Sequence, residues 1–269
     1  MVPLAAGSQP TGREINPGLL GPNALAPYET SGPWVGDRWL VTFGAAVQLS
    51  TPVSGTDFSL SLPFRIEYPF VRRAAIWVEG TPLEAFQYST ETQVAWAPSR
   101  AAGVTRGDLT LGTRFVVFPG TKWFPAVAAR VMLKTATGEN LANRRFLDAP
   151  AYQLDLLLGQ RFPLAGGLLE LALNLGFLAW QQGEAGQNDA FAGSGRLRWD
   201  YKQLGVRLEV RGYSGWQQND LVRVGVVGVD WTVAGPLRVE FSASRSFQDP
   251  AGFDFRLGVR LSGPSLPSP

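Results

Sequence analysis

The sequence contains no histidine and no cysteine, and only three of its 24 basic residues are lysines, namely Lys122, Lys134 and Lys202. The absence of cysteine excludes disulfide bonds and thiolate chemistry. Histidine is the side chain whose pKa best suits proton transfer near neutral pH, so its absence excludes general acid–base catalysis through imidazole.

Dense charge and long apolar runs are also missing. Charged residues make up 17% of the chain, below the roughly 25% of average soluble domains. No stretch approaches the ~18 uninterrupted apolar residues of a membrane helix. The net charge of +2 is too small, and the basic residues are too scattered, to indicate a nucleic-acid partner. The 31 glycines and 20 prolines are spread along the chain, which is typical of many short strands and turns.

The sequence does contain a strict alternation of apolar and polar residues, which begins at residue 37 after an irregular stretch rich in Gly, Pro, Asn and Ser. Successive side chains of a strand point to opposite sides, so such a segment has one apolar and one polar face. The last segment shows this best, with apolar positions at Phe253, Phe255, Leu257, Val259 and Leu261 and the other face at Asp254, Arg256, Gly258 and Arg260.

The alternation predicts twelve strands, over residues 37–50, 57–70, 74–88, 107–118, 124–135, 150–163, 167–181, 189–202, 204–217, 220–233, 236–248 and 252–263. Most exceed the usual 5–6 residues, and roughly 9–11 tilted residues span a bilayer. Short connections near residues 71–73, 120–122, 164–166, 203 and 234–235 alternate with longer ones over 89–106, 136–149 and 182–187. Bacterial outer-membrane barrels have short periplasmic turns and longer outer loops, and an even strand count places both ends on the periplasmic side.

Aromatic residues gather at the predicted strand ends, as expected where amphipathic rings settle at headgroup level. We expect one set at the periplasmic interface and a second at the outer interface. The first comprises Trp39, Tyr68, Phe70, Trp123, Phe162, Trp199, Tyr201 and Trp231, and the second comprises Trp180, Phe191, Trp216, Phe247 and Phe253.

These patterns predict an all-β chain that forms a transmembrane, antiparallel, up-and-down β-barrel of about 12 strands. We expect three parts: an irregular N-terminal segment over 1–36, which is a plug or a periplasmic tail, the barrel over 37–263, and a tail over 264–269. The alternative is a soluble β-sandwich or lipocalin-like barrel with the apolar faces inward. Strand length, the end-placed aromatics and the arginine-rich polar faces favour the membrane.

Two segments resemble uncharacterised Gram-negative outer-membrane barrel proteins. One is Asn-Pro-Gly-Leu-Leu-Gly-Pro-Asn-Ala at 16–24; the other is Leu-Lys-Thr-Ala-Thr-Gly at 133–138, followed by Asp-Ala-Pro-Ala-Tyr at 148–152. Gly-Asp-Leu-Thr-Leu-Gly at 107–112 is also similar to a strand of outer-membrane transporters of the phenol-degradation type. The resemblance covers the whole chain in layout and only short motifs in detail. It implies the fold and an outer-membrane location, and it carries no catalytic residues.

Both ends of the sequence depart from what this resemblance implies. Such barrels usually end on an aromatic residue, whereas this sequence ends Gly-Pro-Ser-Leu-Pro-Ser-Pro at 263–269. Residues 1–6 lack a basic region and a full apolar core of a secretory signal. We therefore expect that the signal has been removed or lies outside this sequence, and a cytoplasmic location stays open as the alternative.

The polar faces carry the candidate functional residues. The predicted register points 21 charged side chains into the lumen: Arg65, Glu67, Glu79, Asp108, Arg114, Arg130, Asp155, Arg161, Glu170, Arg196, Arg198, Asp200, Arg207, Glu209, Arg211, Arg223, Arg238, Glu240, Asp254, Arg256 and Arg260. The two signs are interleaved, and arginine forms bidentate pairs with carboxylates better than lysine does. A twelve-strand lumen lies between side-chain-filled eight-strand barrels and open porins. We therefore expect a narrow or occluded channel braced by ion pairs.

No enzymatic chemistry is expected. The phospholipases, lipid A deacylases and omptin proteases of the outer membrane depend on histidine, which this chain lacks. Glu79 and Glu84 lie near each other on a predicted strand, but pairing with luminal arginine explains them better than catalysis. A metal site would need oxygen ligands alone, and no spacing resembles a calcium loop. We expect no cofactor and no metal.

The sequence thus predicts a bacterial outer-membrane barrel that acts as a narrow channel or transporter for a small solute. A non-conducting structural or accessory barrel of an envelope complex is the first alternative, and a soluble ligand-binding barrel is the second. The expected partners are the lipid bilayer and, as candidates, other envelope proteins.

Overall fold

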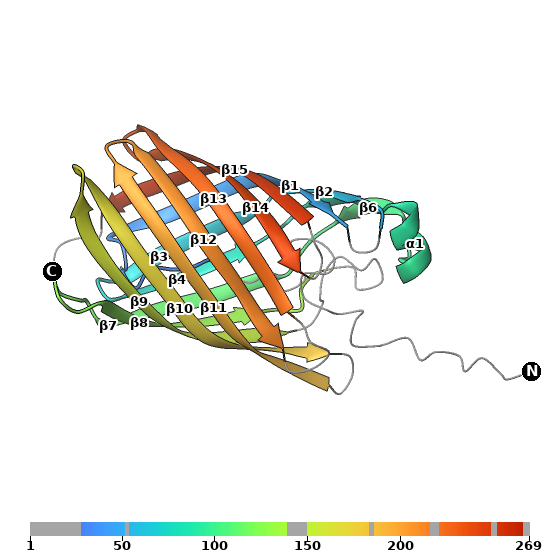
Figure 1. Cartoon of the computed structure of the whole chain (residues 1–269), viewed down its shortest axis with the longest axis horizontal. Coiled ribbons are helices and arrows are strands. Elements are labelled where there is room, and N and C mark those ends of the chain that lie inside the picture. Colours follow the sequence, from blue (N-terminus) through green and yellow to red (C-terminus); the bar gives the residue numbers. More distant parts are fainter. Residues whose placement is uncertain are drawn as a thin grey trace, which may run out of the picture.

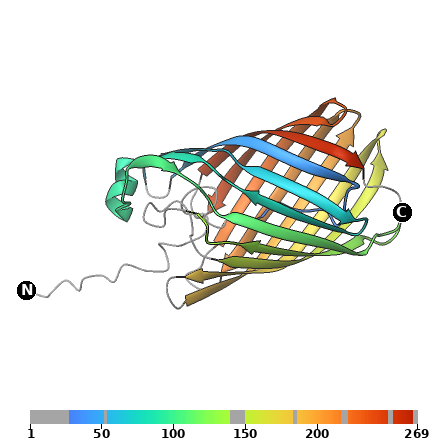
Figure 2. The same cartoon turned by 180° about the vertical axis from the view of Figure 1, so that it is seen from behind.

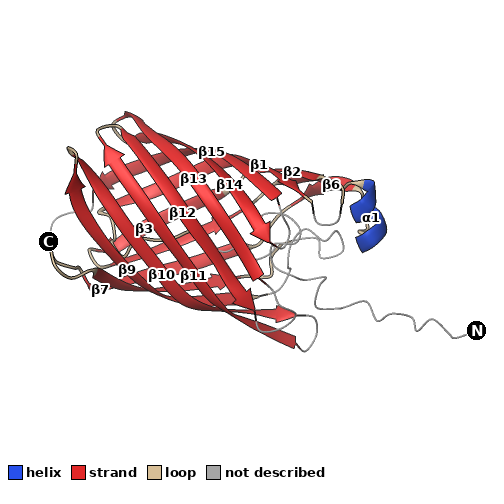
Figure 3. Ribbon diagram, viewed as in Figure 1, coloured by secondary structure: helices blue, strands red, loops and turns tan. Residues whose placement is uncertain are grey.

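The structure is a computed structural model that describes residues 28–51, 54–138, 150–182, 186–215, 221–248 and 252–265. Fifteen strand segments and one helix follow one another along these residues (Figure 3). They are β1 (Arg38–Ser50), β2 (Asp57–Ser61), β3 (Phe64–Val71), β4 (Ala74–Gly80), β5 (Glu84–Gln87), α1 (Thr90–Trp96), β6 (Ala102–Thr105), β7 (Leu109–Phe118), β8 (Ala126–Lys134), β9 (Ala151–Leu164), β10 (Gly167–Gln182), β11 (Gly186–Tyr201), β12 (Leu204–Gly215), β13 (Leu221–Ala234), β14 (Leu237–Gln248) and β15 (Gly252–Ser265).

Twelve strands form a closed antiparallel barrel, as the alternation predicted. The strands of the wall pair in chain order, β1, β3, β4, β7 and then β8 to β15, and β2, β5 and β6 lie outside this series. The last strand closes the barrel on the first, from Ser50 opposite Gly252 to Leu40 opposite Ser262. The tilted strands enclose one lumen (Figure 1), and the view from behind shows β1 beside β15 (Figure 2).

Two predicted strands are each divided in two, and a proline lies in each break. Pro63 separates β2 from β3, and Pro82 separates β4 from β5. Proline has no backbone N–H, so it cannot donate a bond to the sheet ladder. Beyond the breaks the chain no longer follows the barrel wall. Instead β2 pairs with β1 and β5, and β5 pairs with β6, as an extension at one end (Figure 1).

The prediction of a long polar loop over 89–106 is wrong, because this stretch contains α1 and β6. The Ser89 side chain accepts a hydrogen bond from the Thr92 backbone N–H and caps the helix. The helix ends at Ala97, which has left-handed backbone geometry, directly before Pro98. None of the described helices is long and apolar enough to cross a membrane.

Four two-residue turns lie at one end of the barrel, which we call the turn end; the opposite end is the loop end. The prediction of a longer connection over 182–187 is wrong, because β10 extends to Gln182 and β11 begins at Gly186. The turns at 72–73, 165–166, 202–203 and 235–236 link consecutive strands at the turn end, and β1 begins and β15 ends at the same end. Ala165 and Gly166 have φ angles of 50° and 74°. Two successive positive φ angles define the type I′ turn, whose twist matches that of a tight hairpin.

The apolar rows face outward and the charged rows face inward. Leu154, Leu171 and Leu175 are 48%, 42% and 51% exposed, whereas Asp155, Glu170 and Asn174 on the same two strands are buried. The register places the two kinds of row on opposite faces of the wall, because Leu175 pairs with Leu156 while Asn174 pairs with Leu157. This is the reverse of a soluble barrel, in which the apolar rows would fill the interior.

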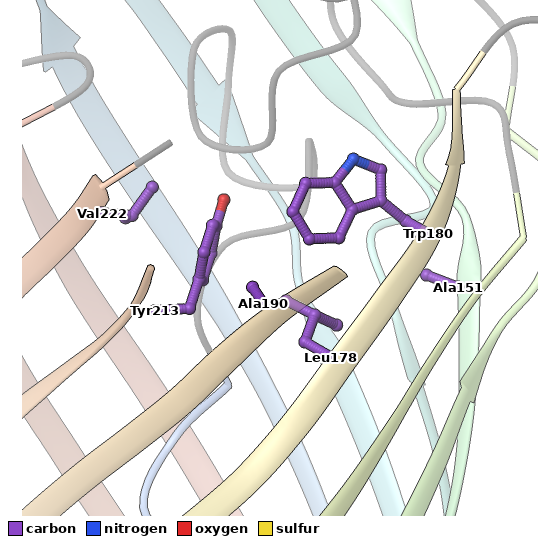
Figure 4. Packing of buried hydrophobic residues seen from close by; sticks show 6 residues of the cluster. All are labelled: Ala151, Leu178, Trp180, Ala190, Tyr213 and Val222. Atoms are coloured by element: carbon purple, nitrogen blue, oxygen red, sulfur yellow. The ribbon is translucent and has the colours of Figure 1, made fainter. Parts of the chain in front are cut away.

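Aromatic side chains at the turn end lie on the outward face, with Tyr68, Trp123 and Trp231 at 48%, 79% and 59% exposed. The placement of Trp180 in an outer aromatic set is wrong: its side chain is 1% exposed and points into the lumen. Trp180 packs there with Ala151, Leu178, Ala190, Tyr213 and Val222 (Figure 4). Trp216, also predicted for that set, lies outside the described residues.

Candidate functional site: the barrel lumen

Nineteen of the 21 charged residues assigned to the lumen lie on the inward face of the wall strands. Asp108 directly precedes β7, is buried, and pairs with Lys134. The prediction that Arg223 points into the lumen is wrong. Arg223 pairs with Gly212 on the outward face, because Val222 and Val224 on either side of it face inward.

Near the turn end, inward-facing arginines and acids form a connected network. Arg198 lies 2.6 Å from Asp200 and 2.8 Å from Asp230, and Arg238 lies 3.0 Å from Asp230. Between β14 and β15, Arg260 lies 2.7 Å from Glu240. Arg198–Asp230, Arg238–Asp230 and Arg260–Glu240 each join two different strands, so these pairs brace the wall from strand to strand.

The opposite wall carries a second network. Glu67 accepts from both Arg65 and Arg114, each at 2.7 Å, and Arg65 also donates to Glu79 at 3.1 Å. Arg65 lies 4.6 Å from the centre of the Trp77 ring. Glu79 is therefore held by a luminal arginine, as expected from the sequence.

The most enclosed ion pair joins Arg130 and Asp155 at 2.7 Å, with side-chain exposures of 2% and 1%. Gln153 donates to the second oxygen of Asp155 at 2.6 Å. Gly176 faces this carboxylate across the strand pair, and a Cβ at that position would lie 2.0 Å from Asp155 Oδ1. Only glycine leaves room for the pair.

Sequence reasoning missed three charged residues of the lumen, namely Glu29, Lys134 and Asp230. For Asp230 a signal was present, because Trp231 was assigned outward and its neighbour must then point inward. Lys134 lies opposite Thr110 in an alternating strand, and its parity with Arg130 indicates the same inward face. Glu29 lies outside any periodic segment, so no local pattern could place it.

Residues 28–34, which we call the strap, lie inside the lumen and are held there by inward-facing side chains of the wall. Asn174 binds both backbone polar groups of Ser31, accepting from its N–H at 2.8 Å and donating to its carbonyl at 2.9 Å. Glu209 accepts from the Thr30 N–H at 2.9 Å, and Arg196 donates to the Thr30 carbonyl at 2.7 Å. These wall groups replace the hydrogen bonds that an irregular backbone cannot make to itself.

Two further arginines donate to strap carbonyls, Arg130 to Glu29 at 2.9 Å and Arg114 to Gly32 at 3.1 Å. Asn174, Glu209, Arg196, Arg130 and Arg114 come from five different strands, so the strap is tied to the wall on several sides. The irregular segment predicted over 1–36 thus has residues 28–34 in the lumen, while residues 1–27 lie outside the described residues.

The two ends of the strap contact different levels of the barrel. Tyr28 packs against the apolar cluster around Trp180 and Tyr213, which lies toward the loop end. Trp34 stacks on the Arg161 guanidinium, 3.9 Å from its ring centre, near the turn between β9 and β10. Pro33 and Trp34 lie directly on Gly159, where a Cβ would come within 2.6 Å of both. The strap therefore crosses the lumen along one side.

Beside the strap a cavity of about 240 Å³ remains. Seven cationic side chains line it, Arg65, Arg130, Lys134, Arg207, Arg211, Arg256 and Arg260, against four acidic ones, Glu29, Glu79, Asp108 and Glu240. A much smaller cavity of about 10 Å³ lies next to Gln153, Asn174 and Ser194. The larger of these two cavities, which we call the chamber, is therefore rich in cationic side chains.

Glu29 projects from the strap into this chamber. Its Oε1 lies 3.6 Å from Arg256 Nη1 and 3.9 Å from Arg211 Nη1. Enclosure by the wall opposes ionisation, but the charges of Arg207, Arg211 and Arg256 outweigh that effect and lower the pKa of Glu29 below its ordinary value. The Glu29 carboxyl is therefore ionised at neutral pH.

A larger hollow of about 910 Å³ lies on the outward face, lined by Leu171, Leu173, Leu208, Val227 and Phe247 among others. Its lining is almost entirely apolar, and in a transmembrane barrel this face meets lipid chains. We therefore place the candidate solute site in the lumen.

Glu84 lies on β5, outside the barrel wall, opposite Ser61 and Thr105. Within the described residues there is no group of three or more acidic side chains that could hold a metal ion.

Solved structures with a similar fold include outer-membrane barrels. An outer-membrane channel from Pseudomonas putida F1 has a TM-score of 0.62 at 12% identity, covering 88% of this chain and 100% of that one. The KdgM porin in complex with disordered oligogalacturonate has a TM-score of 0.53 at 11% identity, covering 84% and 99%. The translocator domain of the autotransporter NalP from Neisseria meningitidis has a TM-score of 0.50 at 11% identity, covering 83% and 87%. No protein-family model and no curated protein matches the sequence.

Proposed function

We propose that the chain is a channel of the Gram-negative outer membrane that passes a small solute through a narrow, charged lumen. The observation that carries the proposal is the inverted wall: leucine, valine and phenylalanine rows outside, and ion-paired arginine and acidic rows around a water-accessible chamber inside. The similarity to an outer-membrane channel and a porin supports the same reading. With lipid around the wall, the inward face of the described strands offers polar groups to a solute.

The strap sets the expected size of the pore. Residues 28–34 fill one side of the lumen, and about 240 Å³ remains on the other. We therefore expect small, discrete conductance from the purified full chain in planar lipid bilayers, and larger conductance after deletion of residues 1–36. Absence of conductance from both proteins would contradict the proposal.

The second candidate is a non-conducting barrel that accompanies a larger envelope assembly. The density of short ion pairs and the strap across the lumen favour it, since both brace the barrel and obstruct passage. Other envelope proteins would then be its partners. Purification in mild detergent tests this candidate, because it predicts a constant co-purifying protein, and repeated recovery of the chain alone would contradict it.

A further inference from the structure

We propose that Arg207, Arg211 and Arg256 form a carboxylate-binding subsite in the lumen, that the solute is a small organic anion, and that Glu29 occupies the subsite as an internal competitor. This inference rests on the proposed channel function and names its solute class. All three arginines and Glu29 line the same chamber. The strap thus presents to the wall the chemical group that the solute would present.

The contacts of Glu29 are long compared with those of the wall. The distances of 3.6 Å and 3.9 Å to Arg256 and Arg211 contrast with 2.5–2.8 Å in pairs such as Arg196–Glu170 and Arg198–Asp230. The Glu29 side chain is 48% exposed to the chamber, whereas Glu209 and Asp155 are each 1% exposed. Charge-assisted hydrogen bonds at their optimum measure about 2.7–2.9 Å. Glu29 occupies the subsite without fitting it closely.

The backbone of the strap, in contrast, is firmly held. Arg130 donates to the carbonyl of Glu29 itself at 2.9 Å, and the next residue, Thr30, bonds both Glu209 and Arg196. A rotation of the Glu29 side chain breaks none of these bonds. A solute can therefore displace the carboxylate while the strap stays in place.

The subsite carries positive charge that the wall does not neutralise. Arg256 is paired with Asp254 at 2.9 Å, but Arg211 reaches Glu209 only at 3.6 Å. Arg207 has no carboxylate within 4.0 Å among the described residues, and it lines the same chamber as Glu29. Guanidinium groups match the planar carboxylate with two parallel donors. The chamber of about 240 Å³ limits the solute to a small molecule.

The test is calorimetric titration of the detergent-purified full chain with succinate, and with neutral succinamide as a matched probe. We expect succinate alone to bind, and Glu29→Gln to tighten binding about tenfold, because a tethered competitor acts at millimolar effective concentration. Glu240→Gln is the control, since it adds the same charge change to the same chamber without freeing the three arginines. We expect it to alter succinate affinity by less than about threefold, because Glu240 pairs with Arg260, which water partly screens.

A second pair of variants tests the arginines in the Glu29→Gln background. Arg207→Gln leaves no described acid without its partner, and we expect it to weaken succinate binding at least about tenfold. Arg245→Gln, on the outward face against Phe247 and Phe253, should leave binding unchanged. Heat-modifiable gel mobility confirms that each variant is folded.

The inference is overturned if Glu29→Gln and Glu240→Gln have equal effects, if succinamide binds as well as succinate, or if no folded variant binds succinate. Conductance separates this from the channel proposal. Conductance without succinate binding rejects the carboxylate subsite alone, whereas succinate binding without conductance rejects the channel and leaves the subsite.

Discussion

At the scale of single residues, the lumen is a set of ion pairs that differ widely in their access to water. Arg130 and Asp155 are almost completely enclosed, whereas Arg260 beside Glu240 is 32% exposed. Breaking an enclosed pair leaves one charge without a partner where water cannot reach it, but breaking an exposed pair lets water replace the lost group. Loss of one partner of the enclosed pair therefore lowers the stability of the barrel more. The exposed pairs mainly set the charge of the chamber.

This difference predicts that Asp155→Asn destabilises the barrel by about 3–5 kcal/mol, while Glu240→Gln costs about 1 kcal/mol or less. The first leaves the Arg130 charge buried without its carboxylate, and the second leaves Arg260 partly hydrated. Urea unfolding of protein folded into phospholipid vesicles, followed by tryptophan fluorescence, measures both. Equal losses would show that water reaches the Arg130 site.

At the scale of elements, the strap packs against a part of the wall where a glycine leaves room for it. Pro33 and Trp34 lie on Gly159 of β9, where no side chain intervenes, and Trp34 also covers Arg161. The proline ring is rigid, so it cannot yield to a new methyl group by changing rotamer. A single methyl group at position 159 must therefore move the strap.

We expect Gly159→Ala to raise the conductance of the full chain toward that of the protein without residues 1–36. Gly258→Ala is its matched control, because a Cβ there has only ordinary contacts, the nearest at 3.6 Å from the Phe43 carbonyl oxygen. Single-channel recording in planar bilayers compares the two variants. The same conductance from Gly159→Ala and the wild type would mean that the strap does not limit the pore.

At the scale of the whole molecule, the alternation of residue types was sufficient to predict the twelve strands of the wall and their inward and outward faces. Each strand of a lipid-facing wall repeats the same contrast between apolar outward and polar inward residues. The prediction failed where that contrast is weak. On β13, valine occupies both faces, so Arg223 was placed inward although it lies eight residues, an even number, from the outward-facing Trp231. Strand parity would have corrected this position, and also Trp180 on β10.

Other features depend on contacts that no local pattern contains. The division of two strands at Pro63 and Pro82 arises because β2 and β5 pair with each other beyond the wall. The position of Glu29 is set by residues far along the chain, such as Arg211 and Arg256. The sequence could predict a crowded, ion-paired lumen, but it could not show that a strap carboxylate faces Arg211 and Arg256 there.

The central claim is that the apolar rows of this barrel meet lipid and the charged rows enclose the lumen. Two adjacent residues of β14 test it most directly, because Phe241 is 52% exposed on the outward face and Ser242 is buried on the inward face. The chain has no native cysteine, so Phe241→Cys and Ser242→Cys each accept one fluorescent label. In vesicles with brominated lipid chains, we predict strong quenching at position 241 and little at 242. Stronger quenching at 242 than at 241 would contradict the account.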